Sequence, residues 1–269
     1  MKSSQLFQSV LLVTGCVKPV EGQAYLVLKD ADERLRQYRE GLRYYLENTG
    51  FKRIVFCENS NCRFEFSDLE CVANNQGKEL EILSFCGNTE ETRIRGKGFG
   101  EGEIVAYALE HSRYAESIRH FVKVTGRLIV RNLEDIRTRL DSSRFYINRL
   151  LIRNNPNVLD TRLYAIPAKM YKRCFQALHK NVTVEYTLEQ SFMDCVRKNE
   201  IQYRCFPHYP LFQGMCGGDG MGYGTESPLF RFVMETASVT GCFNHKDFSN
   251  LLVYCREKRI SLLKCRRIH

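Results

Sequence analysis

The stretch from Arg95 to Glu103 combines four glycines with two basic and two acidic side chains. Glycine permits tight turns and a close approach of the backbone to a ligand. An apolar helical pattern follows directly, and the start of a helix offers unpaired N–H groups and the positive end of its dipole to an anion. With Lys97 beside Gly98 and Gly100, the pattern predicts a phosphate-binding loop ahead of a helix from about Gly102 to Ser117.

Two well-known phosphate-binding patterns do not fit this stretch. Its glycines recur at every second position from Gly96 to Gly102, whereas the dinucleotide-binding pattern is Gly-x-Gly-x-x-Gly. The sequence also lacks the Gly-Lys-Ser/Thr ending of the other common phosphate loop. The stretch therefore indicates an anionic ligand without identifying it.

The elements around this stretch alternate between predicted strands and helices. Short apolar runs bounded by Gly, Pro or polar residues predict buried strands at 7–15, 53–57, 79–85 and 121–127. Residues 30–48 show helical spacing with Asp30 as the cap, and 68–74 predicts a short helix or turn. This rhythm predicts an α/β fold with a mostly parallel central sheet flanked by helices.

Polar residues follow the predicted strands, at the edge where sheets of this kind bind ligands. Besides the glycine-rich stretch they are Thr14, Gly15, Glu58, Asn59, Thr125, Gly126 and Arg127. We expect them to surround one anionic ligand, with Arg34 from the first helix reaching a phosphate or fixing Glu58. The alternatives are solvated surface charge for the cations and an ordinary turn for Glu58 and Asn59.

The second half of the chain alternates less clearly. It predicts strands at 144–153 and 162–166, helices at 169–179, 187–198 and 247–267, and an extended segment at 205–213. A second glycine-rich stretch, at 214–224, is too dense in glycine for regular structure. Because no linker or repeat marks a boundary, we expect a single domain over residues 1–269.

The composition is that of an ordinary globular protein with an anionic partner. Of 269 residues, 43% are hydrophobic and 26% are charged, and no apolar run is long enough for a membrane span. The start of the chain does not read as a secretory signal, so we expect the cytoplasm. A formal charge of +9 leaves nucleic acid, nucleotide-linked substrates and an anionic membrane open as partners. The twelve cysteines lack zinc-site spacing.

Five blocks in this sequence together resemble bacterial glycosyltransferases of the GT-A fold, of the type encoded with capsule and lipopolysaccharide O-antigen assembly. The blocks are Thr14-Gly15 with Pro19, Asp32-x-Arg34-x-x-x-Tyr38, Phe56-Cys57-Glu58-Asn59-Ser60, Arg95 to Glu101, and Lys123 to Arg127 with Asn132. The resemblance covers residues 8–135 closely and extends loosely to about 225. It implies an α/β nucleotide-binding sheet that holds a nucleotide-sugar.

The resemblance also implies a division of the chain into functional parts. Residues 1–135 would bind the nucleotide-sugar, 136–245 would form the acceptor side, and 246–269 would be a basic tail. The implied activity is transfer of a hexose from a donor such as UDP-galactose to a hydroxyl of a surface polysaccharide or its lipid-linked precursor. Residues 250–267 form a basic amphipathic pattern, typical either of a helix on an anionic membrane or of a helix packed on its own domain.

One departure from the family concerns the metal ion. Most GT-A enzymes carry Asp-x-Asp at the end of a central strand, where it holds a divalent cation on the diphosphate, but that strand here ends Thr125-Gly126-Arg127. The only literal Asp-x-Asp, Asp30-Ala31-Asp32, is interpreted as a helix cap with a surface acid. We therefore expect metal-independent transfer, with a divalent cation as the alternative. The cations that would stabilise the leaving diphosphate are Lys97, Arg127, Lys123 and Arg95.

An inverting transferase also needs a carboxylate that takes the proton from the acceptor hydroxyl. Glu189 falls in the first turn of the helix predicted at 187–198 and resembles part of a Leu-Glu-x-x-Phe block of related transferases. Asp219, in the second glycine-rich stretch, is the other candidate. Helix capping is the alternative for Glu189, and turn formation for Asp219. Glu101 is interpreted as a cap or brace of the first glycine-rich stretch.

Two other functions compete with this interpretation. A nucleic-acid-binding protein would suit the positive charge and the Arg/Tyr-rich residues 34–45, but these aromatic residues recur at helical spacing and no nucleic-acid-binding motif is present. A nucleotidyltransferase would also use a glycine-rich stretch with a lysine. It normally requires a pair of metal-binding acids, which the sequence does not show in a suitable place.

Overall fold

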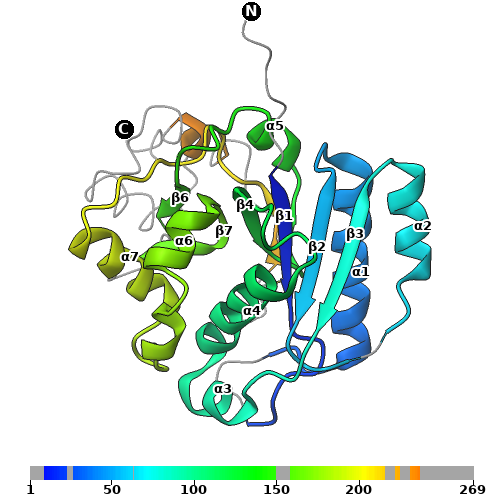
Figure 1. Cartoon of the computed structure of the whole chain (residues 1–269), viewed down its shortest axis with the longest axis horizontal. Coiled ribbons are helices and arrows are strands. Elements are labelled where there is room, and N and C mark those ends of the chain that lie inside the picture. The colour runs from blue at the N-terminus through cyan, green and yellow to red at the C-terminus, as the bar shows by residue number, and fades with distance from the viewer. Residues whose placement is uncertain are drawn as a thin grey trace, which may run out of the picture.

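The computed structural model describes residues 9–22, 27–62, 64–149, 158–215, 222–224 and 231–236 (Figure 1). Four predicted features lie wholly or partly outside these residues: the start of the strand at 7–15, the end of the strand at 144–153, Asp219 in the second glycine-rich stretch, and the basic tail. The membrane contact expected of 250–267 therefore stays a prediction. Among the described residues, none of the helices combines the length and apolar character needed to cross a bilayer.

The central sheet has six strands in the order β3-β2-β1-β4-β7-β6. They are β1 (Val10–Gly15), β2 (Arg53–Glu58), β3 (Glu79–Ser84), β4 (His120–Thr125), β6 (Tyr146–Arg149) and β7 (Leu159–Pro167). The pairings among β3, β2, β1 and β4 are parallel, whereas β7 runs antiparallel to both of its neighbours. The predicted α/β fold with a mostly parallel central sheet is confirmed.

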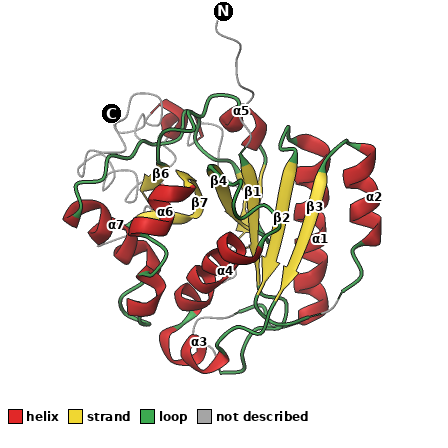
Figure 2. Cartoon of the chain, viewed as in Figure 1, coloured by secondary structure: helices red, strands yellow, loops and turns green. Residues whose placement is uncertain are grey.

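Helices cover both faces of this sheet (Figures 1 and 2). Successive side chains of a strand point to opposite faces, so Leu11 and Val13 of β1 pack towards α1 (Ala31–Asn48) and α2 (Ser67–Asn75). Val10 and Leu12 pack towards α4 (Lys97–His111) and α7 (Leu188–Lys198). Burial on both sides explains why β1 reads as a continuous apolar run.

The remaining described elements are short. They are α3 (Thr89–Arg95), α5 (Leu133–Arg137), α6 (Ala168–Cys174), the 3-10 helix η1 (Leu178–Asn181), and a small sheet of β5 (Ile129–Val130), β8 (Phe212–Met215) and β9 (Gly222–Tyr223).

The start of α1 has the predicted cap. Asp30 precedes the helix and its carboxylate accepts the N–H of Glu33 at 2.7 Å. The interpretation of the Asp30-Ala31-Asp32 triplet as a cap is therefore confirmed for Asp30. Tyr38 and Tyr45 of the same helix are buried in the core, so the aromatic residues that favoured a nucleic-acid partner serve packing.

The first glycine-rich stretch is helical, and the prediction of a loop there is wrong. α3 ends at Arg95, and Gly96, with a φ of 87°, joins it to α4, which begins at Lys97. This φ lies in the left-handed region that favours glycine. The helix predicted from about 102 to 117 therefore spans 97–111 instead.

Close packing explains the glycines inside α4. A Cβ on Gly98 would lie 3.2 Å from the Cβ of Leu188 in α7, and one on Gly102 would lie 2.9 Å from the Cγ of His179 in η1. A side chain at Gly102 would hold α4 away from η1, and one at Gly98 would make a tight contact with α7. The spacing that suggested a phosphate loop is thus a helix surface against which other elements pack.

The second half differs from prediction in two further places. The helix predicted at 169–179 is α6 followed by the separate turn η1, because the N–H groups of Phe175 and Gln176 both bond to the Tyr171 carbonyl and end α6. Gly214, predicted to lie in an irregular loop, belongs to β8, which pairs with β9. A Cβ on Gly214 would lie 2.7 Å from the Arg127 carbonyl, so glycine is needed there for a close backbone approach.

Candidate functional site

A pocket opens at the carboxyl ends of the parallel strands β1 and β4, between the first half of α1, the residue after β2 and the start of α4. Eight of the predicted site residues line it: Thr14, Gly15, Arg34, Asn59, Lys97, Gly100, Thr125 and Arg127. The space is about 120 Å³, below the 300–1,000 Å³ that encloses a drug-sized ligand. The pocket would therefore surround part of such a ligand and leave the rest exposed.

Of the residues predicted to bind the nucleotide-sugar, Glu58, Gly98 and Gly126 do not line the pocket. Gly98 packs against α7, and Gly126 donates its N–H to the Thr14 carbonyl at 2.9 Å and so joins the ends of β1 and β4. The Glu58 carboxylate is 1% exposed and accepts the N–H groups of Ser60 and Cys62 at 2.8 and 2.9 Å. Glu58 thus shapes the turn after β2, as its alternative interpretation held.

The Arg34 side chain donates hydrogen bonds to backbone carbonyls of the segment between β1 and α1. Its Nε and Nη2 donate to the Cys16 carbonyl at 2.8 and 2.6 Å, and its Nη1 donates to the Leu28 carbonyl at 3.1 Å. The expectation that Arg34 fixes Glu58 is wrong, because its hydrogen bonds go to these carbonyls. The guanidinium is buried and forms part of the pocket wall.

Asn59 lines the pocket and carries an acceptor that no described residue uses. The residue is 8% exposed, and its Oδ1 is buried with no hydrogen-bond partner among the described residues. A buried polar atom without a partner costs about 1–3 kcal/mol, so such atoms usually have a reason. A ligand N–H or O–H placed in the pocket would satisfy it.

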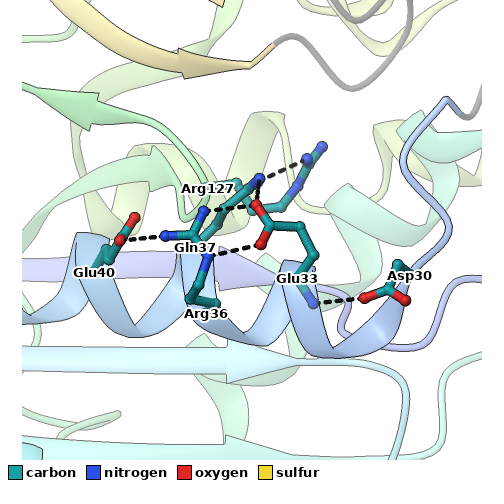
Figure 3. A network of polar contacts seen from close by, with 6 residues as sticks. All are labelled: Asp30, Glu33, Arg36, Gln37, Glu40 and Arg127. Atoms are coloured by element: carbon teal, nitrogen blue, oxygen red, sulfur yellow. Dashed lines mark hydrogen bonds and ion pairs between the residues drawn. The ribbon is translucent and has the colours of Figure 1, made fainter.

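Two cations from different parts of the chain, Lys97 and Arg127, line the same space. Lys97 is exposed at the first position of α4, and within the described chain its ammonium has no hydrogen bond or ion pair. Arg127 is 9% exposed and donates from Nη1 to Gln37 Oε1 at 3.3 Å. Gln37 in turn donates to Glu33 at 2.7 Å, which ties Arg127 to the polar network on the surface of α1 (Figure 3).

Lys123 is not available to a ligand, which corrects its prediction as a diphosphate contact. The side chain is 0% exposed, on the face of the sheet that α4 covers. Its Nζ forms an ion pair with Glu101 and donates to Thr125 Oγ1 at 3.1 Å and to the Thr161 carbonyl at 2.7 Å. These three partners use all the donors of an ammonium group.

Arg95 and Glu101 also differ from their predicted roles. Arg95 pairs with Glu91 and donates to the Lys180 carbonyl at 3.1 Å, and it does not line the pocket. Glu101 is not a cap of a glycine loop, because it lies in the second turn of α4, where it pairs with Lys123 and lines the pocket.

Glu189 is connected to the pocket without lining it. Its Oε1 accepts the Thr161 hydroxyl at 3.1 Å, and the carbonyl of the same threonine accepts from Lys123. The helix cap at this point is Thr187, which forms a capping box with Gln190, so the capping alternative for Glu189 is wrong.

Several pocket residues were not predicted as site residues. Thr92 comes from α3, a helix that was not predicted, and Ile104 belongs to the apolar helical pattern that follows the glycine-rich stretch. Cys16 follows β1 directly, and burial raises the pKa of its thiol to about 11, so it is a neutral group at physiological pH. Tyr38 is part of a resemblance block, and its hydroxyl accepts the N–H of Cys16 at 2.9 Å.

In the described part of the chain, no group of three His, Cys, Asp or Glu side chains is placed to hold a metal ion.

No protein-family model matches the sequence, and a comparison with curated proteins gave no match. Among solved structures, similar chains include the glycosyltransferase GlyE of Streptococcus pneumoniae TIGR4, with 12% identity and a TM-score of 0.47 over 74% of this chain. Another similar chain, from Desulfovibrio desulfuricans G20, is described as a nucleotide-diphospho-sugar transferase. It has 9% identity and a TM-score of 0.47 over 75% of this chain and 80% of its own. The bifunctional glycosyltransferase WbbM has 11% identity and a TM-score of 0.42 over 74% of this chain.

The chain matches less than half the length of two of these proteins, 45% of GlyE and 39% of WbbM. All three TM-scores lie below 0.5. The likeness therefore assigns neither an activity to this chain nor a role to any of its residues. The function proposed below rests on the geometry of the pocket.

Proposed function

We propose that the protein is a glycosyltransferase with a GT-A-like fold that transfers a hexose from a nucleotide-sugar, with a UDP-sugar such as UDP-galactose as donor. The acceptor is a hydroxyl of a bacterial surface glycan or of its lipid-linked precursor. The observation that carries this proposal is the convergence of Lys97, Arg127 and Asn59, whose buried Oδ1 has no described partner, on one pocket at the carboxyl edge of the sheet.

The two cations suit a diphosphate. Lys97 stands at the N-terminus of α4, where the positive end of the helix dipole adds to its charge. Arg127 lines the same pocket, and a guanidinium binds phosphate oxygens through parallel hydrogen bonds. Together they would stabilise the charge that develops on the diphosphate as the glycosidic bond breaks.

Asn59 suits the nucleobase. Its amide carries one acceptor and two donors, which match the N–H and carbonyl groups on the edge of a uracil. The Oδ1 that lacks a partner would accept the ring N–H. This supports a pyrimidine nucleotide and makes UDP the ligand to test first.

Replacing Lys97 with methionine is expected to weaken UDP binding by about tenfold or more, since a hydrogen bond to a charged group is worth about 1.5–3 kcal/mol. Isothermal titration of wild type and variant measures this. Lys172→Met, an exposed lysine on α6 outside the pocket, is the matched control and should bind UDP as wild type does. Failure of the wild type to bind any nucleoside diphosphate would refute the proposed function.

The same titration examines the expected independence from metal. We expect UDP to bind with EDTA present, because Lys97 and Arg127 supply the positive charge that a metal ion would otherwise bring. Binding that strictly requires manganese would show instead that a divalent cation takes part.

Glu189 is our candidate for the base that activates the acceptor, supported by its link through Thr161 and Lys123 to Glu101, which lines the pocket. Glu189→Gln keeps the hydrogen-bonding shape of the side chain but cannot take up a proton. The variant should bind UDP with unchanged affinity and release UDP from UDP-galactose at least 100-fold more slowly, in line with the usual contribution of general-base catalysis. A variant with unchanged turnover would exclude Glu189 and leave Asp219 as the candidate.

A further inference from the structure

One carboxylate among the described residues lines the otherwise cationic pocket, and it belongs to Glu101. Its Oε1 is held by the Lys123 ammonium, and its Oε2 has no hydrogen-bond partner within the described chain. The side chain is 23% exposed, so this second oxygen is within reach of a ligand. An acid at this point would repel a diphosphate, and its presence therefore calls for another explanation.

Lys123 holds this carboxylate in one position. The lysine side chain comes from the middle of β4, and its Nζ is fixed by Thr125, Thr161 and Glu101 together. Burying an ammonium costs several kcal/mol, and an apolar pair of similar volume is often as stable. Stability alone does not account for the ion pair, whereas a carboxylate fixed in direction is what a binding site requires.

A fixed carboxylate oxygen is an acceptor only, so its ligand must be a donor. In a pocket that binds a nucleotide-sugar, the donors available are the hydroxyl groups of the ribose and of the transferred hexose. We propose that Glu101, positioned by Lys123, accepts a hydrogen bond from one of these sugar hydroxyls and so selects the donor substrate. This inference rests on the function proposed above.

The test is a thermodynamic cycle between the carboxylate and the hydroxyl. The variant is Glu101→Ala/Lys123→Met, which removes one charge of each sign and leaves no buried ammonium without its partner. Titrations compare UDP with 2′-deoxy-UDP and 3′-deoxy-UDP for the ribose, and UDP with UDP-galactose for the hexose. If the ribose is the partner, loss of one of its hydroxyls should cost wild type about tenfold in affinity and the variant almost nothing. If the hexose is the partner, the wild-type preference for UDP-galactose over UDP should fall by a similar factor in the variant.

Matched controls separate recognition from general electrostatics. Glu110→Gln changes the same charge on the same helix but lies outside the pocket, and its affinity ratios should equal those of wild type. Glu101→Gln tests whether the carboxylate strengthens or weakens ligand binding. If Glu101 only repels the diphosphate, this variant should bind UDP more tightly than wild type and keep the wild-type affinity ratios between the ligands. That result, or equal ratios in wild type and the double variant, would overturn the inference while UDP binding itself still supports the proposed function.

Discussion

Replacing Glu101 with alanine is expected to lower the free energy of unfolding by about 3–5 kcal/mol, the usual cost of breaking a buried ion pair from one side. The Lys123 side chain is 0% exposed, and its ammonium would keep only neutral partners, the oxygens of Thr125 and Thr161 and the ring of Tyr164. Domains of this kind are stable by about 5–15 kcal/mol in total, so the loss would be plain. Urea unfolding at neutral pH, followed by circular dichroism, measures it.

The double variant Glu101→Ala/Lys123→Met separates the stranded charge from lost packing. Because both charges are then absent, we expect it to be more stable than Glu101→Ala alone, and within about 1–2 kcal/mol of wild type. Glu90→Ala, which breaks the exposed pair with Arg93, should leave stability unchanged within error. If Glu101→Ala behaves like Glu90→Ala, Lys123 does not depend on Glu101 in the way the structure indicates.

The parallel part of the fold could be predicted because its signals are local. β1 is buried on both faces and reads as an unbroken apolar run, and α1 carries both a cap, Asp30, and apolar residues at helical spacing. The antiparallel strand β7 was predicted too short, because the polar residues Asp160 and Thr161 interrupt its apolar run although both are buried in the strand. The polarity of the sequence does not reveal that burial.

The candidate site was predictable where position along a strand decides the role, and not where the packing of a helix on the sheet decides it. Thr14, Asn59 and Thr125 lie at or beyond the carboxyl ends of parallel strands and therefore reach the pocket. Lys123 is only two residues before Thr125, yet α4 covers it and Glu101 pairs with it. That partner becomes visible only once the helix is placed on the sheet.

The glycines of α4 were misread for a different physical reason. Glycine permits both a tight loop around a ligand and a close contact between packed elements, and the sequence does not say which of these is used. At Gly102 the structure favours packing, because the position faces His179 of η1 and does not line the pocket.

Replacing Gly102 with alanine is accordingly expected to destabilise the protein by about 1–2 kcal/mol. The added Cβ would overlap the Cβ of His179 and lie 2.9 Å from its Cγ, atoms that cannot move without shifting the η1 backbone. Overpacking of this kind costs about 1–3 kcal/mol and outweighs the gain of up to about 1 kcal/mol that alanine brings to a helix. Thermal unfolding and urea titration measure the change.

Gly98→Ala on the same helix is the matched comparison. Its Cβ would meet Leu188 at 3.2 Å, a contact that small shifts can relieve, so the helix-propensity gain should leave stability close to wild type. Both variants are then titrated with UDP. If the glycines formed a phosphate-binding loop, both variants would keep wild-type stability and bind UDP more weakly. If the glycines form a packing surface, Gly102→Ala is the less stable protein and Gly98→Ala keeps wild-type UDP affinity.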